Sequence, residues 1–362
     1  MKPLKLLTLA TCSVFCLGAS AQDSNLLRKQ VDSLKSIIQD YEHRFDVLEK
    51  KIDDNQWFIR LKDVAFVDKV FIYGPPNANA KDTTKVGATN PVKFYSYVFI
   101  PKGIDASKKY PLIVLPHGGV HADFTTYHYH IIRELLAQKY IVVAPEYRGS
   151  TGYGKSFWQL IDYGGREVDD VEASRQYMVE NYDFVDPSRV GIVGWSHGGM
   201  IAMNCLYRFP TKYKVAFAGV PVSDLILRLS YSEPSYAKLF SASYHIGKTI
   251  AEDSAEYKRR SPAFNAHLMP NVPLLIHTNT NDDDVHVEEV KTLIAALKKE
   301  NKKFEYEIFQ RFPGGHSFDR IDGKKNREIR LRIWKFIDKS LNAPVKIKTL
   351  QDMSKAAYLP AE

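Results

Sequence analysis

Apolar and polar residues alternate in two patterns over the second two thirds of the chain. Short apolar runs, typical of buried strands, alternate along the chain with stretches in which apolar residues recur at helical spacing. The runs predict strands over residues 111–115, 140–144, 190–195, 214–220, 273–277 and 304–309, and the stretches predict helices over residues 125–138, 168–182, 197–208, 286–300 and 325–341. Strands that alternate with helices need crossover connections. The pattern therefore predicts an α/β fold over residues 111–342, with a mostly parallel sheet covered by helices on both faces.

A β-rich lead-in is predicted before this region, over residues 57–110. Residues 92–100 alternate between apolar and polar side chains and end at Pro101, as a half-buried strand does. Shorter apolar runs occupy residues 64–67 and 70–73. At the other end of the chain, residues 343–362 are expected to form a C-terminal tail.

Residues 22–56 predict a single amphipathic helix. Its apolar residues follow alternating steps of four and three, which is the heptad repeat of a coiled coil. They are Leu27, Val31, Leu34, Ile38, Tyr41, Phe45, Leu48 and Ile52. The stripe over residues 27–52 either packs along the chain's own domain or joins copies of the chain in a homo-oligomer. We expect the homo-oligomer.

The first 21 residues have the features of a secretory signal peptide. Lys2 and Lys5 precede an apolar run over residues 6–17, and residues 19–21 (Ala-Ser-Ala) form a small-residue cleavage site. The run is too short to span a bilayer, and no other stretch reaches the roughly 18 apolar residues that a span needs. We therefore expect an exported protein, periplasmic or secreted, with no membrane span.

The three cysteines bear on anchoring and on disulfides. A lipoprotein anchor at Cys12 or Cys16 is not expected, because Thr11 and Phe15 stand where lipoprotein processing needs a small residue. Cleavage of the signal peptide would leave only Cys205, so no internal disulfide is expected.

Composition and charge exclude several classes of protein. The chain has 362 residues, of which 44% are hydrophobic and 25% charged, which excludes collagen-like, low-complexity and disulfide-scaffold proteins. The net charge is +8, but basic residues are scattered among acidic ones and form no dense block. We interpret the charge as a solvated surface and expect no nucleic-acid partner.

The segment 194–199 (Gly-Trp-Ser-His-Gly-Gly) carries the clearest chemical signal. It follows the apolar run 190–193 and opens a predicted helix, which is the context in which G-x-S-x-G forms a sharp strand-to-helix turn. Small residues around the serine allow the strained backbone of such a turn. The pattern predicts that Ser196 is a catalytic nucleophile, exposed at the helix N-terminus.

A serine nucleophile needs a base and an acid that orients it, each expected after a strand in the order serine, acid, histidine. His316 follows the last predicted strand on a glycine-flanked loop, and it is the histidine expected to act as base. The acid follows the strand 273–277, within the run Asp282, Asp283 and Asp284. The spacing alone leaves the choice among these aspartates open.

An oxyanion hole is predicted at the end of the strand 111–115. His117, Gly118 and Gly119 follow it, and glycines let backbone N–H groups approach a substrate oxygen closely. The N–H groups of Gly119 and His197 are expected to face the developing negative charge.

Two other chemistries compete with this interpretation. Four histidines precede Ser196 and could bind a metal: His117, His121, His128 and His130. Two of them would lie two residues apart on one helix and so face apart. Residues 149–156 match a phosphate-binding loop, G-x-x-x-x-G-K-S, but residues 145–148 separate the loop from its strand. We expect no metal and no cofactor.

Taken together, these motifs resemble the α/β-hydrolase catalytic domain of the prolyl oligopeptidase family of serine peptidases, over roughly residues 95–342. The matching segments are residues 117–119, 147–154, 163–165, 168–171, 185–190, 194–199, Asp282 with Val285, and 314–316. The resemblance implies that Asp282, three residues before Val285, is the acid. It also implies that residues 147–154 have no phosphate-binding role, and that Val222, Leu225 and Val285 line the primary specificity pocket.

The chain departs from the family in two respects. Larger members carry a β-propeller before the catalytic domain, and the residues before 111 are too few to form one. Some relatives have an asparagine two residues after the acid, where this chain has Asp284. The predicted signal peptide and the resemblance together imply an exported serine hydrolase that cleaves peptide bonds through an acyl-enzyme, while the two departures make esters plausible substrates. The alternatives are a carboxylesterase for small or carbohydrate-linked acyl esters, and a catalytically idle scaffold that oligomerises through its N-terminal helix.

Overall fold

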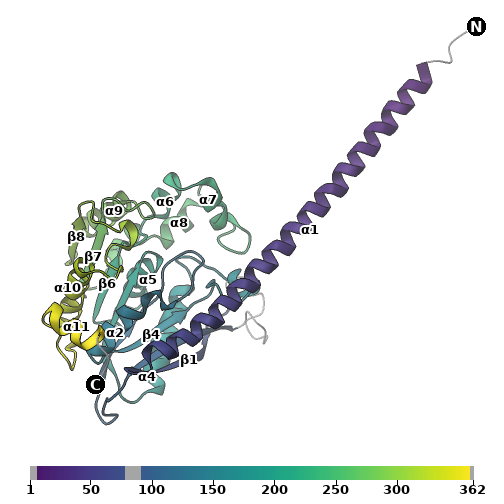
Figure 1. Cartoon of the computed structure of the whole chain (residues 1–362). Coiled ribbons are helices and arrows are strands. Elements are labelled where there is room, and N and C mark those ends of the chain that lie inside the picture. Colours follow the sequence, from purple (N-terminus) through teal and green to yellow (C-terminus); the bar gives the residue numbers. More distant parts are fainter. Residues whose placement is uncertain (1–5, 78–90, 359–362) are drawn as a thin grey trace, which may run out of the picture.

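The computed structural model describes residues 6–77 and 91–358, with side chains from residue 24 onward. Most of the chain forms one body, and the helix α1 (Leu6–Leu61) runs along this body and then projects far beyond it (Figure 1). No helix in the described ranges combines the length and apolar character that crossing a bilayer requires. The predicted signal peptide, residues 1–21, falls on a segment whose side chains lie outside the described part.

An eight-stranded sheet forms the centre of the body. Its strands, in spatial order, are β1 (Ala65–Gly74), β2 (Val92–Pro101), β4 (Ile141–Glu146), β3 (Tyr110–Val114), β5 (Val185–Trp195), β6 (Val215–Gly219), β7 (Leu274–Asn279) and β8 (Glu305–Phe309). β2 pairs antiparallel with β1 and β4, and all other neighbours pair in parallel. The predicted α/β fold with a mostly parallel sheet is confirmed, and each predicted strand overlaps an observed one.

Helices cover both faces of the sheet, because alternate residues of the buried strands point to opposite sides. Leu112 and Val114 belong to one apolar core, and Ile113 and Leu115 belong to the other. The first core includes residues of α4 (Glu167–Asn181), α5 (His197–Arg208) and α9 (Val287–Lys299), and the second includes residues of α2 (Tyr129–Ala137), α10 (Lys324–Leu341) and α11 (Leu350–Tyr358).

Several short elements had no counterpart in the sequence pattern. Between β6 and β7 the chain forms α6 (Leu225–Tyr231), α7 (Pro234–Ser241), α8 (Ser254–Arg260) and the 3-10 helix η2 (Pro262–Leu268); the other short elements are α3 (Lys155–Trp158) and η3 (Gly315–Ser317), while η1 (Thr126–His128) and α2 together fill the predicted helix 125–138. Each element without a counterpart spans at most eight residues, so none of these repeats the helical period often enough to be recognised.

Both ends of the chain differ from the predicted boundaries. α1 continues to Leu61, so the first residues of the predicted β-rich lead-in are helical. The reason is packing: Trp57 and Leu61 are fully buried, and the Trp57 ring stacks on Phe124 at 5.3 Å. The predicted C-terminal tail contains α11, which packs against α2 and buries Met353.

Candidate active site

Ser196 lies in the turn between β5 and α5 with a backbone that few non-glycine residues adopt, φ 59° and ψ −123°. The neighbouring glycines make this turn possible. A Cβ at Gly194 would lie 2.1 Å from the carbonyl oxygen of Gly198, and a Cβ at Gly198 would lie 2.3 Å from that of Pro116. The Ser196 N–H donates to the Gly219 carbonyl at 2.9 Å and fixes the turn on β6. Glycine is therefore required at positions 194 and 198 because a larger side chain would collide with the backbone.

His316 lies in η3, after β8, and is held by Asp282, which follows β7. Its Nδ1 is 2.8 Å from Oδ2 of Asp282 and 3.0 Å from Oδ1. Asp282 is buried, and its Oδ1 also accepts the backbone N–H groups of Asp284 at 3.0 Å and Val285 at 2.9 Å. Because Nδ1 donates to the carboxylate, Nε2 is left free to accept a proton. Of the three consecutive aspartates, Asp282 is the one that contacts Nδ1, while Asp283 is exposed.

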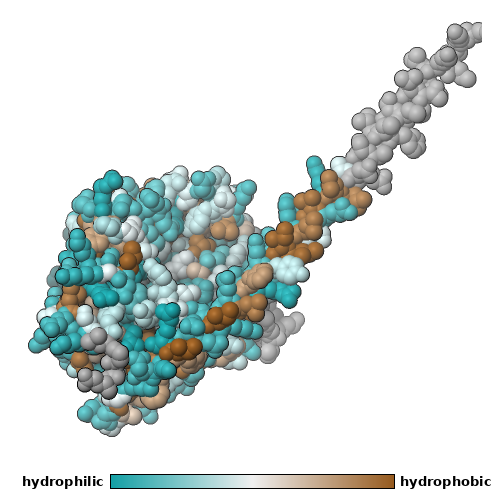
Figure 2. Space-filling view, viewed as in Figure 1, coloured by the Kyte–Doolittle hydropathy of each residue, from teal (hydrophilic) through white to brown (hydrophobic). Residues whose placement is uncertain are grey.

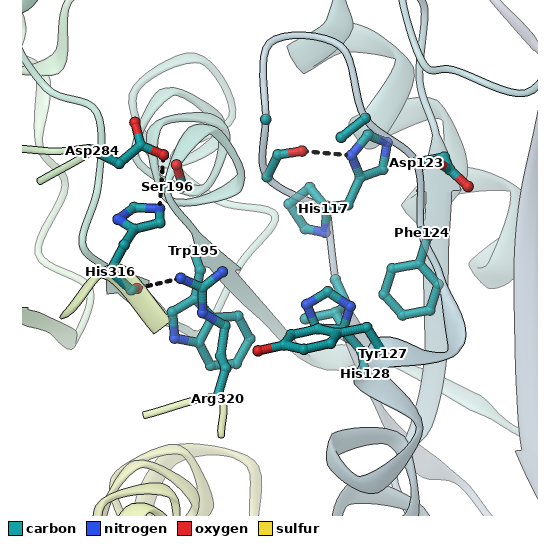
Figure 3. A pocket seen from close by; sticks show the side chains of 15 residues that line it. His117, Asp123, Phe124, Tyr127, His128, Trp195, Ser196, Asp284, His316 and Arg320 are labelled. Carbon is teal, nitrogen blue, oxygen red and sulfur yellow. Dashed lines mark hydrogen bonds and ion pairs between the residues drawn. The ribbon is translucent and has the colours of Figure 1, made fainter. Parts of the chain in front are cut away.

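Ser196 and His316 line the same cavity, whose volume is about 210 Å³ (Figure 3). Gly118 and Gly119 form part of its wall, and a Cβ at Gly118 would lie 3.2 Å from the Cβ of Ser196. The structure therefore brings together the predicted nucleophile, the predicted base and the predicted oxyanion loop. Aromatic and imidazole side chains complete the wall: Phe124, Tyr127, His128 and Trp195.

The predicted oxyanion loop is tied to the start of α5. The His197 Nδ1–H donates to the Gly119 carbonyl at 2.8 Å, and the His197 ring stacks on Tyr163 at 3.7 Å. Gly119 has φ +86°, a conformation in which glycine is favoured. Within the described part of the chain, no hydrogen bond uses the N–H of Gly119 or of His197. Both N–H groups are therefore available to a substrate oxygen.

A buried polar network, which the sequence did not reveal, joins α1 to this loop. Lys50 of α1 donates to Asp123 at 2.8 Å and to the Phe124 carbonyl at 2.7 Å, and it forms an ion pair with Glu146. Glu146 is fully buried, which raises its pKa to about 7. His117 lies 3.5 Å from Glu146, and burial lowers the pKa of His117 to about 3, so its imidazole is neutral at neutral pH.

The histidines that could have formed a metal site have separate partners. The Nδ1 of His121 lies 2.9 Å from the Gly149 carbonyl, and the Nε2 of His130 lies 2.8 Å from the Arg320 carbonyl. His128 stacks on Phe124 at 5.5 Å. In the part of the chain that the structure describes, no group of three or more metal-ligating side chains occurs.

Two charged residues lie beside His316: Asp284, one of the three candidate acids, and Arg320, which the sequence did not single out. Asp284 places Oδ2 3.6 Å from Nε2 of His316, and its Oδ1 lies 2.7 Å from Nη2 of Arg228. His316 and Arg228 lower the pKa of Asp284 against the opposing effect of its partial burial, so this carboxylate is charged at neutral pH. Arg320 donates to the His316 carbonyl and lines the cavity (Figure 3).

The predicted specificity residues lie elsewhere. Val222, Leu225 and Val285 are all completely buried in the apolar core beside α5 and α9, and none of them lines the cavity at Ser196. Asp224 fixes the start of α6 by accepting the N–H groups of Ile226 and Leu227, and the first residue of this helix, Leu225, packs into the core. The walls of the cavity at Ser196 come from residues 115–128 together with Trp195, Asp284, His316 and Arg320.

Similarity to known sequences covers the region that carries these residues. The sequence model of the prolyl oligopeptidase family matches residues 127–344, more than half of the chain. The chain is 31% identical over 234 residues to the uncharacterized peptidase YuxL of Bacillus subtilis (strain 168), which covers 64% of this chain and 34% of that protein. It is 29% identical over 247 residues to dipeptidyl peptidase 8 of Homo sapiens, which covers 66% and 26% respectively. The chain thus spans about a third or less of the length of these curated relatives.

Solved structures share the fold. The acylaminoacyl peptidase of Pyrococcus horikoshii superposes with a TM-score of 0.62 at 19% identity, over 83% of this chain and 45% of that one. Dipeptidyl peptidase 4 of Porphyromonas gingivalis superposes with a TM-score of 0.59 at 23% identity, over 76% and 36%. At such identities the likeness concerns the fold alone. The family match over residues 127–344 goes further: this chain belongs to the prolyl oligopeptidase family.

Proposed function

We propose that this chain is an exported serine peptidase that cleaves peptide bonds through an acyl-enzyme. The observation that carries the proposal is the arrangement in one cavity of Ser196, on its strained turn, and His316, whose Nδ1 is bound by Asp282. Family membership supports the same reaction class.

The proposed reaction uses each group in turn. Ser196 Oγ attacks the substrate carbonyl carbon while His316 Nε2 takes the hydroxyl proton. Asp282 keeps Nδ1 protonated and stabilises the imidazolium that forms. The N–H groups of Gly119 and His197 bind the oxyanion, each contributing about 3 kcal/mol in the transition state. His316 then gives its proton to the leaving amine, and water releases the acid from Ser196 by the same steps in reverse.

A carboxylesterase is the second candidate, and the size of the cavity favours it. A volume of about 210 Å³ is below the roughly 300–1,000 Å³ of pockets that enclose drug-sized ligands, so a small acyl group would fill it. A catalytically idle scaffold is the third candidate. The same experiment separates the three.

The test compares peptidyl and short acyl-ester chromogenic substrates on the wild-type chain and on Ser196→Ala. A peptidase hydrolyses the peptidyl set, an esterase hydrolyses only the acyl esters, and Ser196→Ala abolishes both activities. The matched control Ser188→Ala replaces a serine on the exposed part of β5 and keeps full activity. A fluorophosphonate probe that fails to label Ser196 in the folded wild-type protein would favour the scaffold.

Export rests on the sequence of residues 1–21 and has its own test. The protein expressed from the full chain in its native host is recovered from the periplasm or the medium, and its first residue is determined. We expect Gln22. A cytoplasmic protein that retains Lys2 would contradict export without affecting the proposed chemistry.

A further inference from the structure

The apolar heptad residues of α1 are exposed from Leu27 to Ile52. We call them the heptad stripe: Leu27, Val31, Leu34, Ile38, Tyr41, Phe45, Leu48 and Ile52. Their exposed fractions range from 40% at Val31 to 64% at Ile52. Figure 2 shows apolar residues (brown) along the projecting part of α1 and along the part beside the body. An apolar surface of this extent marks an interaction site on a folded protein.

The body contacts the opposite face of α1. If Val31, Ile38, Phe45 and Ile52 are heptad positions a, the residues that meet the body are positions b, c and f. They include His43, Lys50, Asp53, Asp54, Trp57 and Leu61. Four of these six are polar or charged, and they are fixed by hydrogen bonds, ion pairs or, for His43, a ring contact with Trp158. The helix is therefore anchored to the body by one face. The heptad stripe stays largely exposed, and of its residues only Leu48 borders a pocket that body residues, Gly154 and Lys155, also line.

We propose that the heptad stripe binds the heptad stripe of a second copy of this chain in a parallel, two-stranded coiled coil. The choice of partner follows from the residue types. β-branched residues occupy three of the four a positions (Val31, Ile38 and Ile52), and leucine occupies three of the four d positions (Leu27, Leu34 and Leu48). This combination favours two parallel strands. The bodies attach to the outer faces of the two helices, so they do not obstruct the interface between the two heptad stripes, which we call the seam.

The flanking charges agree with this pairing. In a parallel coiled coil a g residue meets the e residue five positions later on the other helix, which places Arg44 beside Glu49 of the second copy. The other g–e pairs contain no like charges: Gln30 with Lys35, Ile37 with Glu42, and Lys51 with Gln56. An antiparallel pair would also match charges, with Arg28 near Glu49 and Lys35 near Glu42. The core residue types decide for the parallel direction, and the test distinguishes the two.

A lipid surface fits this face less well. Helices that lie on membranes have a wide apolar face bordered mainly by Lys and Arg. The heptad stripe is narrow, and its e positions carry both signs of charge: Arg28, Lys35, Glu42 and Glu49. A narrow seam between mixed charges is the surface that a matching helix covers.

Light scattering after size-exclusion chromatography of the full chain at micromolar concentration tests the proposal. We expect a mass twice the 41.3 kDa of one chain. Leu34→Glu with Ile38→Glu puts two charges into the seam and should yield a monomer. The matched control, Ser33→Glu with Ser36→Glu, puts the same charges on the exposed c and f positions and should remain a dimer. Unchanged labelling of Ser196 by a fluorophosphonate, relative to wild type, shows that the body of each variant is folded.

Disulfide trapping tests the direction. In a full chain with Cys12→Ser and Cys16→Ser, the remaining Cys205 is buried, so new cysteines react alone. Leu34→Cys should form a covalent dimer in diamide, because parallel d positions face each other. The proposal would be overturned by a monomeric wild-type chain, or by a control variant that is as monomeric as Leu34→Glu with Ile38→Glu. It would also be overturned by a monomer that binds phosphatidylcholine–phosphatidylglycerol vesicles. So would a dimer that crosslinks only when Leu34→Cys chains are mixed with Phe45→Cys chains, which is the antiparallel pairing.

Discussion

Three consecutive aspartates, Asp282, Asp283 and Asp284, have three different environments. The first is buried and holds His316, the second is exposed, and the third joins Arg228 to the Nε2 side of His316. Their spacing gives no reason to prefer one of them. The turn after β7 makes the distinction, because it folds the N–H groups of Asp284 and Val285 onto the Asp282 carboxylate.

The first prediction compares neighbours in this run. Asp282→Asn should lower kcat/KM by about 10³- to 10⁴-fold, because an amide no longer selects the tautomer with a proton on Nδ1. Asp283→Asn is the matched control and should stay within about twofold of wild type, since this side chain is exposed and surface changes of this kind have small effects. Steady-state kinetics on the best substrate measures both variants. Equal losses in the two would contradict the assigned role of Asp282.

At the scale of elements, α1 has two faces with different chemistry. One face carries the heptad stripe, and the other carries Lys50, which lies buried between Asp123 and Glu146. Asp123 also lines the cavity at Ser196, so α1 is in contact with the loop that holds the predicted oxyanion hole. The helix is thus a structural part of the site region as well as a projecting arm.

The second prediction concerns Lys50. Lys50→Met should destabilise the body by about 3 kcal/mol or more at pH 9, because it leaves a buried carboxylate without its cation. Burial raises the pKa of Glu146 to about 7, above its ordinary 4.5, so the protonated form is favoured in the folded protein below pH 7. The loss at pH 5 should therefore be smaller than at pH 9. Urea unfolding at the two pH values measures both losses.

A double variant serves as the control for this mechanism. Lys50→Met with Glu146→Gln removes the cation together with the charge that needs it, so it should be more stable at pH 9 than Lys50→Met alone. If the single variant lost the same stability at both pH values, the cause would be lost packing of the Lys50 side chain rather than an uncompensated charge.

At the scale of the whole molecule, the body and the projecting part of α1 are energetically separate. The side chains of residues 24–39 are all exposed, whereas Lys50, Trp57 and Leu61 lock the second half of the helix into the body. Removing the projecting part should cost the fold little, because it buries almost nothing.

The third prediction follows from this separation. A chain that starts at residue 40 should keep its thermal unfolding temperature within about 3 °C of wild type at concentrations where both are monomeric, and should keep Ser196 reactive toward small esters. A chain that starts at residue 62 loses Trp57 and Leu61, exposes Tyr97 and Phe124, and should aggregate or unfold near room temperature. Calorimetry and fluorophosphonate labelling measure both. A large loss on removing residues before 40 would show that the projecting part packs on the body.

Much of the body could be predicted from local patterns. The buried strands and long helices repeat their period often enough to be recognised. The position of Ser196 could be predicted because the turn that holds it needs glycines, at which a Cβ would collide with the backbone. The short helices between β6 and β7 could not be predicted, because they have too few turns. Val222, Leu225 and Val285, which the family resemblance implied as the lining of the specificity pocket, lie in the core.

Local patterns along the chain were enough to predict the α/β order, the heptad of α1 and the positions of Ser196 and His316, because each depends on residues close together in the chain. The folded chain was needed to show which aspartate contacts His316, that Lys50 lies between Asp123 and Glu146 across 73 or more residues, and which face of α1 meets the body. Such contacts join distant segments, and their geometry depends on how the sheet places those segments. The heptad of α1 shows most clearly how local sequence pattern and tertiary packing contribute separately. Its period was readable from the chain, but its exposure to solvent depends on the opposite face of the helix being the one that packs.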